Sequence, residues 1–179
     1  MGISIKALLK DRNFNELDKY INSLISKVDN IKLPIICENS SANAIISYYI
    51  ERANSLSIKT DIQITIPENI NIGSLDLNVV FGNCLENAIE ACSKLTVEEQ
   101  RFLNVKAAIV KHYFVINIIN SFNGIVSLQN DLICSTKENA SNHGIGLESV
   151  KTIVSQYNGT FELSYTQNEF VISIIMFNA

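Results

Sequence analysis

Two asparagines lie one helical turn apart in "FGNCLENAIEACSKL" (81–95), a stretch otherwise typical of a buried helix. Asparagine is a mediocre helix former, because its amide competes for nearby backbone groups. At about 100° per residue, Asn83, Asn87, Glu90 and Lys94 form a polar stripe beside a broad apolar one. Side-chain oxygens along one edge suit Mg2+, which needs few protein ligands when phosphates supply the rest. The alternative is an ordinary solvated helix face.

A glycine-containing segment, "HGIGLESVKTIV" (143–154), precedes and begins a predicted helix. Gly144 and Gly146 allow the backbone to approach a ligand, and the free N–H groups of the following helix favour a phosphate. The alternative is a turn that merely starts a helix. The segment is neither a Walker loop nor a good dinucleotide fingerprint, because Ser149 replaces the third glycine and no strand precedes it.

A third short motif, "NSFNG" (120–124), follows an apolar run that predicts a strand. A side-chain oxygen on Asn120 is suited to accept a hydrogen bond from an exocyclic amine. Gly124 permits close packing against a planar ring. Taken alone, the motif is simply a turn.

The composition limits the possible functions. The chain has 179 residues, 47% of them hydrophobic, with a net charge of −4 and a pI near 5.2, which argue against nucleic-acid binding. No apolar run approaches the roughly 20 residues that span a bilayer, and no signal peptide is recognisable. Four cysteines without CxxC spacing indicate a reducing, cytoplasmic setting, and two histidines exclude a histidine-rich metal site.

The hydrophobic periodicity predicts an α/β fold, with a mixed sheet backed on one face by about three helices. Residues 3–29 predict a helical hairpin with an apolar stripe that needs a partner. A helix is expected from a cap at Ser41, and another from a cap at Ser74. The remaining expectations are a strand at 59–66, a hairpin of 102–110 with 113–120, a long polar loop at 121–143, a helix at 144–159, and a closing hairpin of 160–166 with 169–177.

Together, the motifs NxxxNA, NSxxG and GxGL, in this order, resemble the GHKL ATPase superfamily: gyrases, heat-shock chaperones, mismatch-repair proteins and histidine kinases. Within that group, "NCLENAIEAC", "STKENASNHGIGLESVKTIVSQYNGTFELSY" and "EFVISIIMF" are similar to sensor histidine kinases of the peptide-pheromone type, the accessory-gene-regulator and virulence-sensor receptors. The resemblance implies a two-layer Bergerat-type ATP-binding domain at 34–179. It also implies that residues 1–33 are part of the dimerisation helices, with the phosphoacceptor helix truncated.

The resemblance also implies roles for single residues. Asn83 and Asn87 match the N-box, with Asn87 the expected Mg2+ ligand, and Asn120 stands where most of these kinases hold the adenine amine with aspartate. The loss of charge there predicts modest affinity. Lys137 is expected to neutralise the γ-phosphate. The full set expected to bind Mg-ATP is Asn83, Asn87, Glu90, Asn120, Gly124, Thr136, Lys137, His143, Gly144, Ile145, Gly146 and Leu147, with Asn87 and Lys137 catalytic.

These matches predict transfer of the γ-phosphoryl group of ATP to a histidine on a dimerisation helix missing from this chain, since no histidine precedes position 112. Autophosphorylation of this chain alone is therefore not expected. The implied partners are ATP, a response regulator and a second copy joined through the N-terminal helices, with a membrane link only through an absent sensor domain. Two alternatives are an anti-sigma-type serine kinase and a degenerate module without catalysis.

Overall fold

The computed structural model describes residues 14, 15, 18, 34–124, 127–129, 132–134 and 145–178. The chain divides into two compact units, Met1–Pro34 and Ile35–Ala179. In the first unit only Phe14, Asn15, Asp18 and Pro34 are described, the first three of them as helix. The predicted helical hairpin of residues 3–29 therefore lies almost entirely outside the described residues, and its assignment stays a prediction.

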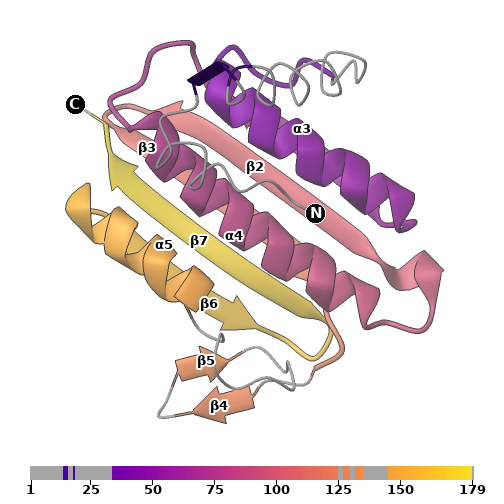
Figure 1. Cartoon of the computed structure of the whole chain (residues 1–179). Helices are drawn as coiled ribbons and strands as arrows, with labels where there is room; N and C mark the ends of the chain where they lie inside the picture. The colour runs from indigo at the N-terminus through magenta and orange to yellow at the C-terminus, as the bar shows by residue number, and fades with distance from the viewer. Residues whose placement is uncertain are drawn as a thin grey trace. The chain divides into compact units, whose positions relative to one another are not determined.

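A five-stranded mixed sheet forms the centre of the second unit (Figure 1). Its spatial order is β1-β2-β3-β7-β6. The strands are β1 (Lys59–Thr65), β2 (Phe102–Val110), β3 (Tyr113–Ser121), β6 (Thr160–Tyr165) and β7 (Glu169–Phe177). β1 pairs with β2 in parallel, and every other neighbouring pair is antiparallel. The predicted hairpins of β2 with β3 and of β6 with β7 are confirmed.

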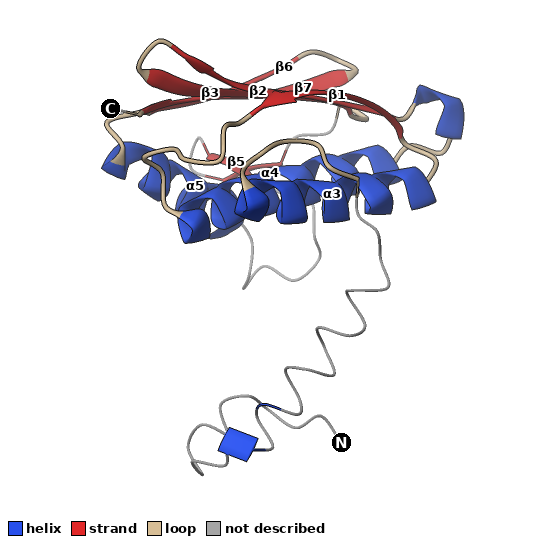
Figure 2. Ribbon diagram, turned by 90° about the horizontal axis from the view of Figure 1, so that it is seen from above, coloured by secondary structure: helices blue, strands red, loops and turns tan. Residues whose placement is uncertain are grey.

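Three helices cover one face of this sheet, as Figure 2 shows. They are α3 (Ser40–Ser55), α4 (Ser74–Ser93) and α5 (Ile145–Gln156), and a short 3-10 helix, Glu98–Gln100, follows α4. Figure 1 shows α4 between the other two helices. The predicted fold class, a mixed sheet with about three helices on one face, is confirmed.

The apolar stripe predicted on α4 packs into the core. Its members Leu77, Val80, Phe81, Cys84, Leu85, Ala88 and Cys92 are at most 1% exposed, and Ile89 joins them. Phe81 contacts Phe114 of β3 edge to face, with ring centroids 6.3 Å apart. Cys37, Cys84 and Cys92 are free thiols. The helix is therefore held by its apolar face, which leaves its polar stripe on one flank.

The helix caps predicted at Ser41 and Ser74 are wrong. Asn39 caps α3, because its Oδ1 accepts a hydrogen bond from the Ala42 N–H at 3.0 Å. Gly73 is the N-cap of α4 and offers no side-chain cap. Ser41, inside the first turn of α3, instead donates to Asn78 Oδ1 of α4 at 3.2 Å. Asp76 lies in the first turn of α4, where its charge favours the helix dipole.

The long polar loop predicted at 121–143 is wrong for seven of its residues, one of which, Ser121, is the last residue of β3. Ser127–Gln129 and Leu132–Cys134 form β4 and β5, an antiparallel pair. Strands of three residues are too short to show an alternating pattern, so the sequence gives no signal for them.

The turn after α5 depends on two residues. Asn158 has a left-handed φ of 48°, and the Gly159 N–H donates to the Val154 carbonyl at 3.0 Å, which ends the helix as its "NG" sequence predicts. A Cβ on Gly159 would lie 2.2 Å from the Ile175 carbonyl oxygen and 2.9 Å from that of Val154. Only glycine fits, since neither backbone atom can move without disturbing a helix or a strand.

We expect Gly159→Ala to lower the free energy of unfolding by about 2 kcal/mol or more, because the clash is with backbone atoms. The matched control is Gly82→Ala in α4, where the new Cβ would have its nearest neighbour at 3.9 Å. Because alanine is the better helix former, this control should gain up to about 1 kcal/mol. Urea unfolding of both variants measures the difference. Equal stability of the two variants would contradict the packing described at Gly159.

Candidate functional site

The side chain of Asn120 is buried and only half satisfied. It is 1% exposed, and its Nδ2 donates to the Ser121 carbonyl at 2.9 Å. Its Oδ1 is the one buried side-chain polar atom among the described residues that lacks a hydrogen-bond partner. The Ser121 carbonyl fixes the orientation of the amide, because a flipped amide would place two acceptors against each other. An unpaired buried acceptor is unfavourable unless a ligand supplies the donor.

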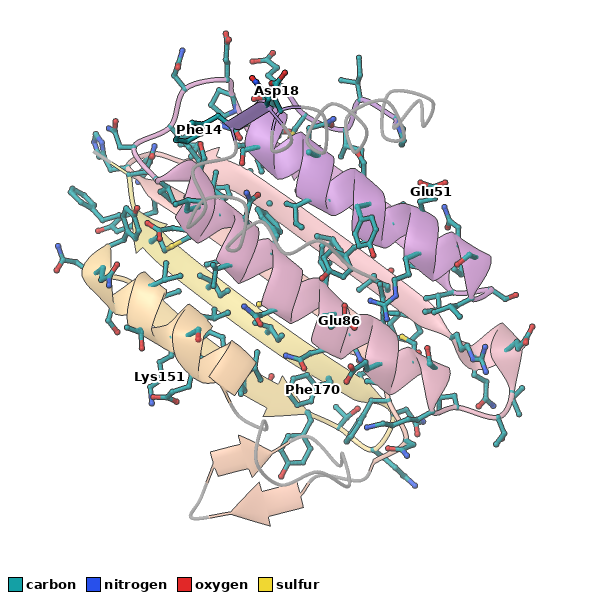
Figure 3. All side chains as sticks on the ribbon, in the orientation of Figure 1. Phe14, Asp18, Glu51, Glu86, Lys151 and Phe170 are labelled. Atoms are coloured by element: carbon teal, nitrogen blue, oxygen red, sulfur yellow. The ribbon has the colours of Figure 1, made fainter. Side chains whose placement is uncertain are left out.

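Aromatic side chains surround this end of the sheet. Across the strands, Asn120 pairs with Phe170 of β7, and Phe170 pairs with Tyr165 of β6, so all three lie on the helix-covered face. Phe122 contacts both rings edge to face, with centroids 5.9 Å from Phe170 and 6.3 Å from Tyr165. Figure 3 labels Phe170 on β7. The unpaired acceptor therefore lies beside an aromatic cluster suited to a planar ring.

A network of short contacts positions the backbone that carries Asn120. Ser121 Oγ accepts from the Phe102 N–H at 3.0 Å and donates to Cys92 Sγ of α4 at 3.3 Å. The Cys92 thiol donates to the Phe102 carbonyl at 3.2 Å, and burial raises its pKa, so it stays protonated as a donor. The end of β3 is thus attached both to β2 and to the C-terminal half of α4.

The polar stripe of α4 faces α5. Asn83 Nδ2 donates to the Val79 carbonyl one turn earlier, at 2.7 Å. A Cβ placed on Gly146, in the first turn of α5, would lie 2.6 Å from Asn83 Oδ1. The structure therefore brings Asn83 and Gly146 into contact, as expected if both border one site, and a larger residue at 146 would require the Asn83 side chain to move.

One turn further along the stripe, Asn87 is half-buried. Its side chain makes no hydrogen bond within the described part of the chain, so its amide oxygen is available to a ligand. Glu90 is half-buried on the same stripe. Asn87 thus meets the requirement for one oxygen ligand of a Mg2+ ion that takes its remaining ligands from phosphates and water. No group of three or more His, Cys, Asp or Glu suited to a metal occurs among the described residues.

Glu86, the residue before Asn87, points the other way, toward α3 (Figure 3). Arg52 Nη1 of α3 donates to Glu86 Oε2, and the hydroxyl of Tyr49 also bonds this carboxylate. Burial, together with the nearby Glu86 charge, raises the pKa of Tyr49 to about 12. Glu86 is therefore occupied on the flank opposite Asn87 and Asn83.

The other expected site residues are only partly described. Gly124 has a left-handed φ of 74°, and a Cβ there would lie 3.0 Å from the Gln167 carbonyl, so this turn needs glycine. Leu147 packs against the core from α5, and Ile145 begins that helix. Thr136, Lys137, His143 and Gly144 lie outside the described residues, and their roles stay predictions.

Sequence reasoning missed the aromatic cluster. Alternation in "TFELSYT" and "EFVISIIMF" places Tyr165 and Phe170 on the face shared with the core, and the strand order then brings them beside Asn120. The alternation can be read from the sequence. The order of the strands cannot, because some forty residues separate β3 from β6 and β7 along the chain.

The comparisons with known proteins identify the family. Residues 72–177, more than half of the chain, match the model of the GHKL domain, and the chain belongs to this family. Among curated proteins, none matches this sequence. No helix among the described residues is long and apolar enough to cross a membrane.

Solved structures share the fold. The catalytic domain of the histidine kinase ThkA is 15% identical, with a TM-score of 0.60 over 78% of this chain and 90% of its own. The Acinetobacter baumannii histidine kinase AdeS is 17% identical, with a TM-score of 0.56 over 99% and 86%. A histidine kinase domain from Erythrobacter litoralis is 14% identical, with a TM-score of 0.50 over 74% and 60%. The fold is therefore that of histidine kinase catalytic domains.

The contact between Asn83 and Gly146 can be tested by a double-mutant cycle. Gly146→Ala should lower the free energy of unfolding by about 1 kcal/mol, because its Cβ meets Asn83 Oδ1. In an Asn83→Ala background the same change should be neutral or stabilising, since the obstructing amide is gone and alanine favours the helix. Urea unfolding of the four proteins gives the coupling energy. Additive effects of the two substitutions would contradict the contact.

Proposed function

We propose that this chain is the ATP-binding catalytic domain of a two-component sensor histidine kinase. The observation that carries the proposal is the unpaired Oδ1 of Asn120, buried beside three aromatic rings at the end of β3. An adenine base satisfies both features, because its exocyclic amine donates to the oxygen and its ring packs against the aromatic side chains. The family membership of residues 72–177 agrees with this assignment.

The residues of α4 and α5 would hold the triphosphate. Asn87 offers a free amide oxygen to Mg2+, whose charge would stabilise the transferring phosphoryl group. The first turn of α5, from Ile145 through Gly146 and Leu147, offers free backbone N–H groups to phosphate oxygens. Asn83 holds the start of α5 against α4. In this proposal Lys137 adds charge at the γ-phosphate, while Thr136, His143 and Gly144 complete the phosphate site.

The finer features of the proposal concern the whole protein. The acceptor is a histidine on a dimerisation helix, and the phosphoryl group then passes to an aspartate of a response regulator. The protein works as a homodimer through its N-terminal helices, on the cytoplasmic side, as part of a receptor for a peptide pheromone. Support for these features is the motif resemblance around the N-box and the GxGL motif at 144–147. Hydrolysis of ATP would need a carboxylate that activates water; the Glu86 carboxylate on α4 is bonded to Arg52 and Tyr49, which favours phosphoryl transfer over hydrolysis.

Nucleotide binding and base selectivity test the site itself. We expect a fluorescent ATP analogue to bind in the presence of Mg2+ and to be displaced more readily by ATP than by ITP. ITP has a carbonyl oxygen in place of the amine, and that oxygen would face Asn120 Oδ1. Asn120→Leu should weaken ATP binding by about tenfold or more and abolish the preference over ITP. The substitution removes both the unsatisfied buried acceptor and the Nδ2 bond to the Ser121 carbonyl, two effects of opposite sign, so the melting temperature of the free protein should stay nearly unchanged.

Two further variants complete this experiment. Asn87→Ala should remove the Mg2+ dependence of binding, whereas Asn54→Ala, an asparagine exposed near the end of α3, should behave as wild type. Binding that is equally tight for ATP and ITP would show that Asn120 does not contact the base. Absence of binding at millimolar nucleotide would favour the degenerate module.

Phosphoryl transfer needs the acceptor. With a helix bearing the acceptor histidine joined in front of residue 1, γ-labelled ATP should label the chain, and Asn87→Ala should abolish the label. A phosphoramidate on histidine is lost in acid and survives alkali, whereas a serine ester survives acid. An acid-stable label would therefore identify the serine kinase alternative. Nucleotide binding without any label would leave the site intact and contradict the kinase assignment.

A further inference from the structure

The face of the sheet opposite the helices has an apolar centre. No described element lies on this face (Figure 2). Val110, Tyr113, Ile175 and Phe177 are 53%, 45%, 40% and 41% exposed, four of the ten large apolar side chains exposed in the described residues. A sheet face open to water normally carries polar residues at these alternating positions. The exposure at the centre therefore needs an explanation.

The apolar residues occur in rows across the three central strands. In the first row Val110, Tyr113 and Phe177 are neighbours on β2, β3 and β7, and the Tyr113 and Phe177 rings lie 5.7 Å apart. In the next row on this face Val115 pairs with Ile175. The edge strands β1 and β6 carry only polar residues on the same face: Lys59, Asp61, Gln63, Thr65, Thr160, Glu162 and Ser164. An apolar centre with a polar rim is the usual anatomy of a protein interface.

The third row on this face carries a positive charge on β2 and a negative charge on β6. It runs from Lys106 on β2 through Asn117 on β3 and Ser173 on β7 to Glu162 on β6. Asn117 Nδ2 donates to Ser173 Oγ at 3.1 Å, so the middle of the row is paired within the sheet. Lys106 and Glu162 are exposed and lie three strands, or roughly 14 Å, apart, too far to pair in one copy.

We propose that this face binds the same face of a second copy, about a two-fold axis that runs along the strands between β3 and β7. Such an axis places β3 of one copy over β7 of the other, and β2 over β6. Tyr113 then meets the partner copy's Phe177, Val115 meets Ile175, and Lys106 meets Glu162, each pair occurring twice. The self-complementary charges argue for a second copy over an unrelated partner.

The alternative axis, across the strands, fits worse. Centred on the row of Val115 and Ile175, it would place Tyr113 and Phe177 over the polar pair Asn117 and Ser173. Only the axis along the strands matches both the apolar rows and the charges. The contact does not involve Asn83, Asn87 or Asn120, so it goes beyond the proposed nucleotide function.

Charge reversal tests this arrangement in the full chain. Lys106→Glu or Glu162→Lys replaces two ion pairs by two repulsions in a dimer of either variant, and each should weaken self-association about tenfold or more. A one-to-one mixture of the two variants restores both ion pairs and should recover wild-type affinity. The matched control is Lys151→Glu on the exposed side of α5, which should leave association unchanged. Sedimentation velocity over a range of concentrations measures all five samples.

Cross-linking separates this contact from any dimer formed through the N-terminal helices. Co-expressed chains carrying Asn117→Cys or Ser173→Cys should form a disulfide between copies on mild oxidation, because these positions face each other across the axis. Peptide mapping identifies the link. A wild-type chain that remains monomeric and gives no such disulfide overturns the proposal. A dimer that is unchanged by both charge reversals and yields no such disulfide overturns it equally, since another surface would then carry the association.

Discussion

The packing of α4 across the sheet is the constraint on which the rest of this structure depends. Its apolar stripe is buried so completely that the rotation of the helix about its axis is fixed. Asn83 must then point toward α5, while Glu86 must point toward α3. The asparagines accordingly lower the helix propensity of α4 at a place where tertiary packing, rather than propensity, holds the helix.

The same packing extends to the end of β3. Cys92, on the buried face of α4, touches the serine that follows Asn120, so the helix and the strand end form one rigid unit. The acceptor oxygen of Asn120 cannot turn away to find another donor, because its own amide nitrogen is bound to the Ser121 carbonyl. A rigid, unsatisfied acceptor is unfavourable in the free protein and useful only to a ligand with a matching donor.

The elements that the sequence predicted well are those with long periodic signals. The stripe from Leu77 to Cys92 and the hairpin of β2 with β3 follow from spacing alone. The cap predictions at Ser41 and Ser74 failed because the residues that precede the helices, Asn39 and Gly73, are also common at N-caps, so residue type alone does not select the position. The lack of a hydrogen-bond donor for Asn120 Oδ1 could not be predicted from the sequence, because whether a buried oxygen finds a donor depends on all of its neighbours in three dimensions. The motif around Asn120 predicts a role in binding the base, and the structure adds the buried, unpaired Oδ1 on which the proposal of that role rests.

The pattern of polar and apolar residues along each strand indicates which faces of the sheet are covered. β6 alternates strictly between polar and apolar residues, and β1 does so from Asp61 to Thr65, as expected for strands with one face in water. β3 does not: in "YFVINIINS" the residues on the helix-covered face are Phe114, Ile116, Ile118 and Asn120, and the opposite face carries Tyr113, Val115 and Ile119 beside the polar Asn117. β7 behaves in the same way: Val171, Ile175 and Phe177 lie on the opposite face, with Ser173 and Glu169 as its polar members. A strand that is apolar on both sides is typical of a sheet buried on both faces, yet the described helices cover only one. The mostly apolar central strands and the polar edge strands therefore point to the same arrangement, in which a second layer covers the centre of the sheet and meets polar residues at its rim.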